Sequence, residues 1–413
     1  MNFLKIISTG AILVSSFVNL YGQTVGDYLN NAEKDRNAGN YESAINNLSA
    51  AIKLDSTITE PYLYRGIAKL ILNRYQDAII DLNKAAGLRP DDSLVYYYRG
   101  SVEGYLGKYD DAMKDYTRCI QLNPKFDDVY SRRGTLEGKL LQYIAALSDF
   151  NEAIRLNPNS ADHYNDRALV ETRLNQNKEA IADGDEAIKL DPKLFDAYIN
   201  RGNAKNNLGD FQNALQDENK AIDLNPNTSA AYYNRGIAEG NLNMRNEVIL
   251  DVNKAIELNT QYVEAYRLRG YLSFQSGNFQ SCIEDLTRIL AINPKSDEIL
   301  ALRGYTYLKL KDFKSAIADY TEAISINPNN ANFCGNRAYA KSELGDHIAA
   351  IEDYNHVLSL TPTAASTYNY RGYSYLKLKN YKQALADYDM ALKVGGPDFK
   401  PDLHYREEAL KGK

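Results

Sequence analysis

Apolar and polar positions in this chain follow a helical period, seen most clearly in residues 93–126. Val95, Val102 and Leu106 are separated by seven and four residues, with Arg99 between them, so all four share one helix face. A second stripe of the same spacing follows after Gly107, and Pro124 ends it, since proline lacks the N–H that a further turn needs. The pattern predicts two amphipathic helices joined by a short turn. The second stripe consists of Tyr109, Ala112, Met113, Tyr116, Cys119 and Ile120.

The same pattern recurs every 34 residues without an insertion. Numbered from residue 25, position 4 is Tyr in nine of eleven copies, position 14 is Leu in nine, position 20 is Ala in nine and position 32 is Pro in eight. A fixed period of this length predicts a solenoid, in which each repeat buries its apolar faces only against its neighbours. The predicted repeats span 25–58, 59–92, 93–126, 127–160, 161–194, 195–228, 229–262, 263–296, 297–330, 331–364 and 365–398.

These residues resemble the tetratricopeptide repeat, and the resemblance covers about nine tenths of the chain. It implies an all-α, right-handed superhelical solenoid of helix-turn-helix repeats, with the first helix of each pair lining an inner groove. In the tail, 399–413, Tyr405 and Ala409 are spaced like positions 4 and 8, and Pro401 suits a first helical turn. We therefore expect a C-terminal capping helix there.

One departure from the family concerns position 7, usually a large apolar residue but Arg in ten copies here. Position 23 is Asp in ten copies, and the first copy lacks both, with Asn31 and Asn47 instead. A buried guanidinium without a carboxylate is costly. We hypothesise an Arg–Asp bridge that joins the two helices of each repeat; the alternative is that the first copy drifted at both places because it lies at the edge.

Irregular residues mark the middle of the chain. Gly184 and Glu218 stand at position 24, where an aromatic or aliphatic residue is expected, so the core should be thinner between Ala180 and Glu218. That predicts a softer joint, unless a neighbouring side chain fills the gap. The seventh repeat carries Arg245 at position 17 and Thr260 in place of proline.

Residues 1–22 lie outside the repeats and carry Lys5 followed by an apolar run from Ile6 to Leu20. A short basic start and an apolar run of this length are typical of a secretory signal peptide, with cleavage expected after Gly22. The alternative is an uncleaved membrane anchor, for which the run is short. We expect an exported protein, periplasmic or secreted, without a stable membrane span after cleavage.

Charge, cysteine content and the absence of catalytic motifs reduce the classes of function that we expect. The formal net charge is −6, which argues against nucleic acid as the main partner. Cys119, Cys282 and Cys334 occupy core slots far apart in sequence, so neither a disulfide framework nor a metal site is expected. Every residue from 25 to 398 belongs to a repeat, and no catalytic motif or phosphate loop occurs. We therefore expect no enzymatic activity and no cofactor.

The resemblance assigns the inner surface to positions 2, 5, 9, 12 and 13, which makes the groove rich in Tyr and Asn. Tyrosine combines broad apolar contact with a hydroxyl, and asparagine can pair with a peptide backbone. The expected function is a protein-binding scaffold for an extended peptide or a partner helix. Alternatives are packing by the tyrosines, self-association as a structural protein, and binding of a glycan or envelope polymer. The groove candidates are Tyr97, Asn165, Asn203, Asn206, Asn207, Tyr233, Asn241, Arg267, Tyr271, Tyr305, Tyr339 and Tyr373.

Overall fold

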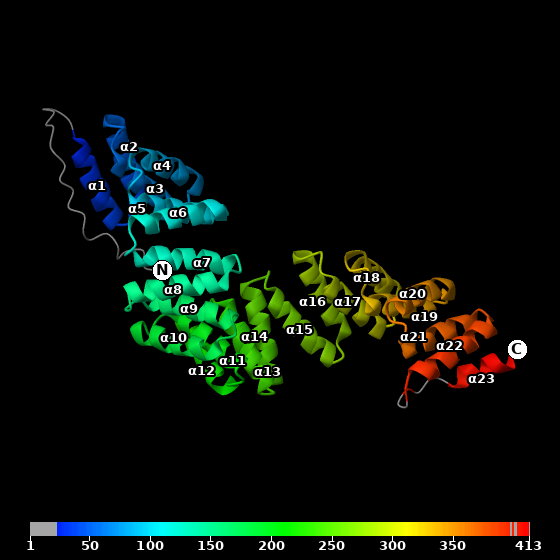
Figure 1. The fold of residues 1–413 in the computed structure, drawn as a ribbon. Helices are drawn as coiled ribbons and strands as arrows, with labels where there is room; N and C mark the ends of the chain where they lie inside the picture. The colour runs from blue at the N-terminus through cyan, green and yellow to red at the C-terminus, as the bar shows by residue number, and fades with distance from the viewer. Residues whose placement is uncertain (1–22, 397–398, 400–402, 413) are drawn as a thin grey trace. The chain divides into compact units, whose positions relative to one another are not determined.

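The computed structural model describes residues 23–396, 399 and 403–412. This range holds 23 α-helices and no strand (Figure 1), so the predicted all-α repeat fold is confirmed. The predicted signal peptide lies outside the described residues. The helices are α1 Val25–Asn37, α2 Tyr41–Leu54, α3 Thr59–Ile71, α4 Tyr75–Leu88, α5 Ser93–Tyr105, α6 Tyr109–Leu122, α7 Asp127–Lys139, α8 Tyr143–Leu156, α9 Ala161–Arg173, α10 Asn177–Leu190, α11 Phe195–Asn207, α12 Phe211–Leu224, α13 Ser229–Asn241, α14 Arg245–Leu258, α15 Val263–Gln275, α16 Phe279–Ile292, α17 Asp297–Lys309, α18 Phe313–Ile326, α19 Ala331–Glu343, α20 His347–Leu360, α21 Ala365–Lys377, α22 Tyr381–Val394 and α23 Leu403–Lys411.

The helices form two compact units, and each is described by itself. Unit 1 extends to Leu224 and contains α1–α12; unit 2 runs from Asn225 and contains α13–α23. In each unit, the two helices of a repeat pack against each other and then against the next pair (Figure 1). This is the nearest-neighbour stacking of a solenoid.

Each repeat turns at position 15 through a left-handed backbone conformation. Glycine supplies it in five repeats, for example Gly107 with φ 74°, and asparagine in three. Leu141, Lys311 and Lys379 adopt the same conformation, with φ between 59° and 62°, although it is unfavourable for their side chains. The turn is therefore imposed by the packing of the two helices and not only by the local residue.

The core is built from small residues on one helix facing large ones on the other. A Cβ added to Gly100 would lie 3.0 Å from the ring of Tyr116, and Gly304 has the same relation to Tyr320 at 3.1 Å. The three cysteines are free and buried, as expected of core fillers. The predicted thin region is filled, because the stem of Arg201 packs against Gly184. The softer joint itself stays a prediction.

The proposed Arg–Asp bridge is confirmed in all ten repeats that carry the pair. Arg99 donates from Nε and Nη2 to the two carboxylate oxygens of Asp115 at 2.6 and 2.7 Å. Asp115 is 5 % exposed, so this bidentate pair joins the two helices inside the core. In the first repeat, Asn47 instead donates to Asp35 at 2.8 Å. The ten aspartates are Asp81, Asp115, Asp149, Asp183, Asp217, Asp251, Asp285, Asp319, Asp353 and Asp387.

The same arginine also links adjacent repeats, which the sequence did not reveal. Its Nη1 donates to position 25 of the preceding repeat; Arg99, for example, reaches Asn83 Oδ1 at 3.2 Å. The guanidinium of Arg99 lies 5.2 Å from the ring centre of Tyr96, at position 4 of its own repeat. The arginine at position 7 thus connects the two helices of its own repeat with the second helix of the preceding repeat. Within the units, the position 25 acceptors are Ser49, Asn83, Thr117, Asn151, Asp185, Asn253, Thr287, Thr321 and Asn355.

The last helix, α23, uses the acceptor that the final repeat leaves open. Arg406 donates from Nε and Nη2 to Asp389, the position 25 residue of that repeat, at 2.9 and 2.8 Å. Ala409 of α23 is fully buried against α22, in a cluster with Leu385 and Tyr388. The tail therefore packs on the last repeat where a further repeat would stand.

Four buried glutamates lie beside these bridges at position 11, one turn after the arginine. Glu103, Glu137, Glu171 and Glu239 are 5–9 % exposed, and one carboxyl oxygen of each is buried without a hydrogen-bond partner. Burial, with the neighbouring aspartate of the bridge, raises the pKa of Glu103, Glu137 and Glu239 to about 7 and that of Glu171 to about 8. The core around these carboxyls therefore favours their protonated, uncharged form.

Candidate functional site

A cavity of about 490 Å³ opens between α17, α19, α20 and α21 in unit 2, and Lys309 is the one charged side chain that lines it. Tyr305, Tyr339 and Tyr370 supply its aromatic surface, and Asn332 and Asn336 supply amides. The lining contains no carboxylate. It therefore offers apolar contact together with amide groups and one ammonium group, Lys309, a combination that suits a peptide.

The tyrosines at position 9 of the last four repeats differ in how accessible they are. Tyr271 is 57 % exposed and Tyr305 is 38 % exposed, with Lys309 Nζ 4.9 Å from the centre of the Tyr305 ring. Tyr339 is half-buried against Tyr370, at 6.1 Å between ring centres. Tyr373 is half-buried against Tyr405 of α23, at 4.9 Å. The position 9 tyrosines are thus exposed in the eighth and ninth repeats and packed against neighbouring rings in the tenth and eleventh.

Unit 1 holds a second cavity, of about 400 Å³, that is strongly charged. It is lined by α5, α7, α9 and α11 and includes two of the groove candidates, Tyr97 and Asn165. Both are buried: Tyr97 packs on Phe126 with ring centres 4.8 Å apart, and Asn165 accepts from Asn200 at 2.8 Å. Burial raises the pKa of Tyr97. Its position is therefore that of a core residue with one edge on the cavity.

One corner of this cavity brings together a group that sequence spacing did not reveal. Asp127, Asp128 and His163 place potential ligand atoms within 4.8 Å of one another, so the described residues do include a set that could hold a metal ion. His163 Nε2 lies 3.1 Å from Asp127 Oδ2, and Nδ1 has no partner. Metal-ligating histidines ordinarily anchor their second nitrogen, which is not the case here. The hydrogen bond to Asp127 accounts for the geometry without an ion.

The remaining groove candidates lie apart from both cavities. Asn206 is buried, and Asn207 donates to Asn177 of the preceding repeat at 3.1 Å. Tyr233 packs on Tyr262 at 5.0 Å between ring centres. Asn241 donates to a carbonyl of its own helix at 2.9 Å. Asn203 is half-buried and Arg267 is exposed.

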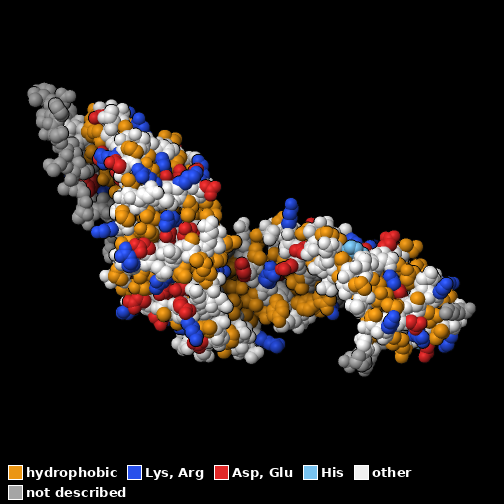
Figure 2. All heavy atoms as spheres, viewed as in Figure 1, with side chains coloured by type: hydrophobic (Ala, Val, Ile, Leu, Met, Phe, Trp, Pro, Cys, Tyr) orange, Lys and Arg blue, Asp and Glu red, His pale blue; other side chains and the backbone are white. Residues whose placement is uncertain are grey.

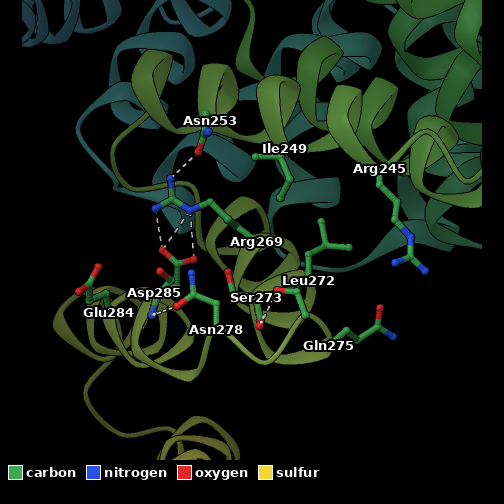
Figure 3. A pocket seen from close by; sticks show the side chains of 12 residues that line it. Arg245, Ile249, Asn253, Arg269, Leu272, Ser273, Gln275, Asn278, Glu284 and Asp285 are labelled. Atoms are coloured by element: carbon green, nitrogen blue, oxygen red, sulfur yellow. Dashed lines mark hydrogen bonds and ion pairs between the residues drawn. The ribbon is translucent and has the colours of Figure 1, made fainter.

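A third cavity, of about 880 Å³, separates α14 from α15 and α16 in unit 2 (Figure 3). Two substitutions in the repeat pattern coincide there: Arg245 replaces the usual aromatic residue of position 17, and Ser276 replaces the leucine of position 14. The bridge between Arg269 and Asp285 is intact at 2.6 Å, whereas Arg245 extends along the far side of the cavity, beyond Leu272. The cavity therefore results from lost apolar contact between neighbouring repeats.

Sequence reasoning missed position 6 as a lining position. It contributes Tyr98, Arg132 and Asp166 to the cavity in unit 1, and Asn336 and Tyr370 to the cavity in unit 2. Position 6 follows position 2 by one helical turn, so the two positions share a face. The four-residue spacing of positions 2 and 6 can be read from the sequence, so position 6 could have been predicted to line the same surface.

The outer surface of unit 1 is mixed in charge (Figure 2). Figure 2 shows acidic and basic side chains interspersed on the visible face of unit 1. No helix among the described residues has the length and apolar character to cross a membrane.

Stacked helix pairs, with two cavities lined mainly by first helices, define an α-helical repeat scaffold. Models of the tetratricopeptide repeat match residues 93–126, 298–330 and 365–394, residues 29–93 and 131–194, and residues 195–228 and 331–363. The chain belongs to the tetratricopeptide repeat family. Comparison with curated proteins gave no match.

Solved structures with a similar fold include other proteins of this kind. A tetratricopeptide repeat protein from Parabacteroides merdae ATCC 43184 is 21 % identical, with a TM-score of 0.49, over 60 % of this chain and 98 % of that one. YrrB, described as a TPR protein with an unusual peptide-binding site, is 20 % identical, with a TM-score of 0.37, over 46 % and 97 %. MamA is 23 % identical, with a TM-score of 0.37, over 39 % and 95 %.

Proposed function

We propose that this repeat scaffold is non-enzymatic and holds an extended peptide or a partner helix on the face formed by its first helices. The cavity between α17, α19, α20 and α21 in unit 2 carries the proposal. Tyr305 and Tyr339 offer rigid aromatic contact, and Asn332 and Asn336 offer amides that can pair with a peptide backbone. Tyr271 extends the accessible aromatic surface towards the preceding repeat.

The test is selection of peptides from a displayed random library on the full chain, followed by fluorescence anisotropy with a selected peptide. Tyr305→Ala combined with Asn336→Ala should weaken binding about tenfold or more, because an aromatic anchor and a backbone partner are both lost. Tyr109→Ala is the matched control, since Tyr109 is 37 % exposed, Tyr305 is 38 % exposed, and Tyr109 lines neither cavity. Equal binding by all three proteins would place the peptide elsewhere.

The export of the chain belongs to the same proposal. It rests on the apolar segment 6–20 that follows Lys5. Intact mass spectrometry of the protein from its native host should show the loss of residues 1–22. A mass that retains them would overturn cleavage.

A further inference from the structure

The cavity in unit 1 has an unbalanced charge. Five carboxylates and two basic side chains, Arg132 and Lys193, line it together with His163. Arg132 is already engaged with Tyr97. The carboxylates belong to Asp128, Asp162, Asp166, Asp191 and Asp196.

Three of these acids occupy the same place in successive repeats. Asp128, Asp162 and Asp196 all stand at position 2, at the start of α7, α9 and α11. Because position 2 recurs once per repeat along the stack, the acids form a row parallel to the direction in which an extended segment would run. Asp166 lies one turn further along α9.

The acids in the cavity lack full compensation by the protein. Burial and the charge of Asp162 raise the pKa of Asp166 to about 6, and burial and the charge of Asp127 raise the pKa of Asp128. The Asp166 carboxylate accepts a long hydrogen bond of 3.4 Å from the Ser131 hydroxyl. A positive charge brought into the cavity would relieve this repulsion.

A second observation concerns His163, which lines the cavity and is 2 % exposed. A carboxylate only accepts, so the ring must donate from Nε2 to Asp127. In the tautomer that carries its proton on Nε2, Nδ1 is an acceptor, and it is buried without a partner. A buried acceptor of this kind is costly unless a donor reaches it, and an ammonium or guanidinium group is such a donor.

The walls suit the stem of a long basic side chain. Tyr97 and Phe195 lie on the lining together with Leu194. Lysine and arginine place their methylene stems on apolar or aromatic surface while the charged head meets acceptors.

We infer that the cavity formed by α5, α7, α9 and α11 receives a lysine or arginine side chain of a basic protein segment, with Asp162 and Asp166 as its main ion-pairing groups. The inference rests on the proposed function, because it names the chemistry of the segment that the scaffold holds. It distinguishes the two cavities: the one in unit 1 selects a cation, whereas the one in unit 2 has no carboxylate and offers aromatic rings, amides and Lys309.

The test uses fluorescein-labelled peptides in which alanine alternates with lysine, glutamate or glutamine. Binding to the full chain is measured by anisotropy at low and at physiological salt. Asp162→Asn with Asp166→Asn removes two charges from the cavity. Asp110→Asn with Asp111→Asn removes two charges from the exposed start of α6 and is the control for net charge.

The lysine peptide should bind, the other two should not, and the cavity variant should lose at least tenfold in affinity while the control loses less than threefold. Asp196→Asn is a second, milder variant in case the double change disturbs folding, and it should lose about threefold. Equal losses in cavity variant and control, or no binding of the lysine peptide, would overturn the inference.

Two further arms separate the possible failures. Spermidine carries ammonium groups without a peptide backbone; if it binds as tightly as the lysine peptide, a free polyamine replaces the protein segment. A neutral peptide selected from the library that binds while the lysine peptide does not would defeat this inference and leave the proposed function standing. Failure of every peptide would defeat both.

Discussion

Replacing Glu103, Glu137 and Glu171 with glutamine should make unit 1 more stable at neutral pH and remove much of its dependence on pH. These carboxyls are buried beside the Arg–Asp bridges, and their pKa values are raised from an ordinary 4.5 to about 7, 7 and 8. A raised pKa means that the folded chain binds more protons than the unfolded chain between these values. The contribution of these three glutamates to the free energy of unfolding is therefore complete below about pH 4.5. It is lost as pH rises through about 7 to 8.

The magnitude follows from the size of the shift. A shift of one unit corresponds to about 1.4 kcal/mol, so the full shift of Glu103 would correspond to roughly 3 kcal/mol. A practical experiment measures only the part of this free-energy change that occurs above about pH 5.5. The adjacent Arg99 also screens the charge of ionised Glu103. We expect about 1 kcal/mol for each glutamate, or about 3 kcal/mol for the three, between about pH 5.5 and pH 8.

The assay is urea denaturation of the full chain at both pH values, followed by circular dichroism. The wild type should be less stable at the higher pH, and the triple glutamine variant should change much less. Glu179→Gln with Glu298→Gln and Glu322→Gln changes the net charge equally at exposed positions and should behave as the wild type does. A wild type whose stability does not fall with rising pH, or a triple variant that falls in parallel, would refute the reasoning.

Three further changes test the packing. Leu141→Gly should stabilise the chain by about 1 kcal/mol in denaturation, because Leu141 has φ 62° and is 72 % exposed, and Leu141→Ala should not. Arg99→Ala should cost about 3–5 kcal/mol by leaving Asp115 buried and unpaired, whereas Arg99→Met with Asp115→Leu should cost clearly less; equal costs would deny the bridge its structural role. Arg245→Tyr with Ser276→Leu should fill the cavity beside α14 and raise stability by about 1 kcal/mol, with slower hydrogen exchange in α14 and α15; unchanged exchange would contradict this.

The fold and the Arg–Asp bridge were predictable because both depend on residues that recur at one position. A pattern repeated eleven times reports contacts within a repeat, and the joint absence of Arg and Asp from the first copy indicated that they pair. The contact of Arg99 with Asn83 was not predictable in the same way, since position 25 is Ser, Asn, Thr or Asp and shares only the ability to accept a hydrogen bond.

The cavities were harder to predict because each depends on departures from the pattern. The cavity beside α14 is lined by both Arg245 and Ser276, two departures from the pattern that stand on consecutive repeats. The acidic cavity needs the row at position 2 together with Asp166 at position 6. Whether a groove tyrosine is open or packed depends on the neighbouring repeat, as Tyr373 and Tyr405 show.

The contact between Arg406 and Asp389 occupies the hydrogen-bond acceptor that links each repeat to the next one. Every interior repeat offers an acceptor at position 25, and growth by addition of another arginine-bearing repeat would need that acceptor to be vacant. At the last repeat it is occupied by α23, and at the first repeat Asn31 stands where the donor would be. Neither end of the described stack therefore presents the pair of a position 7 arginine and an open position 25 acceptor that joins neighbouring repeats within each unit.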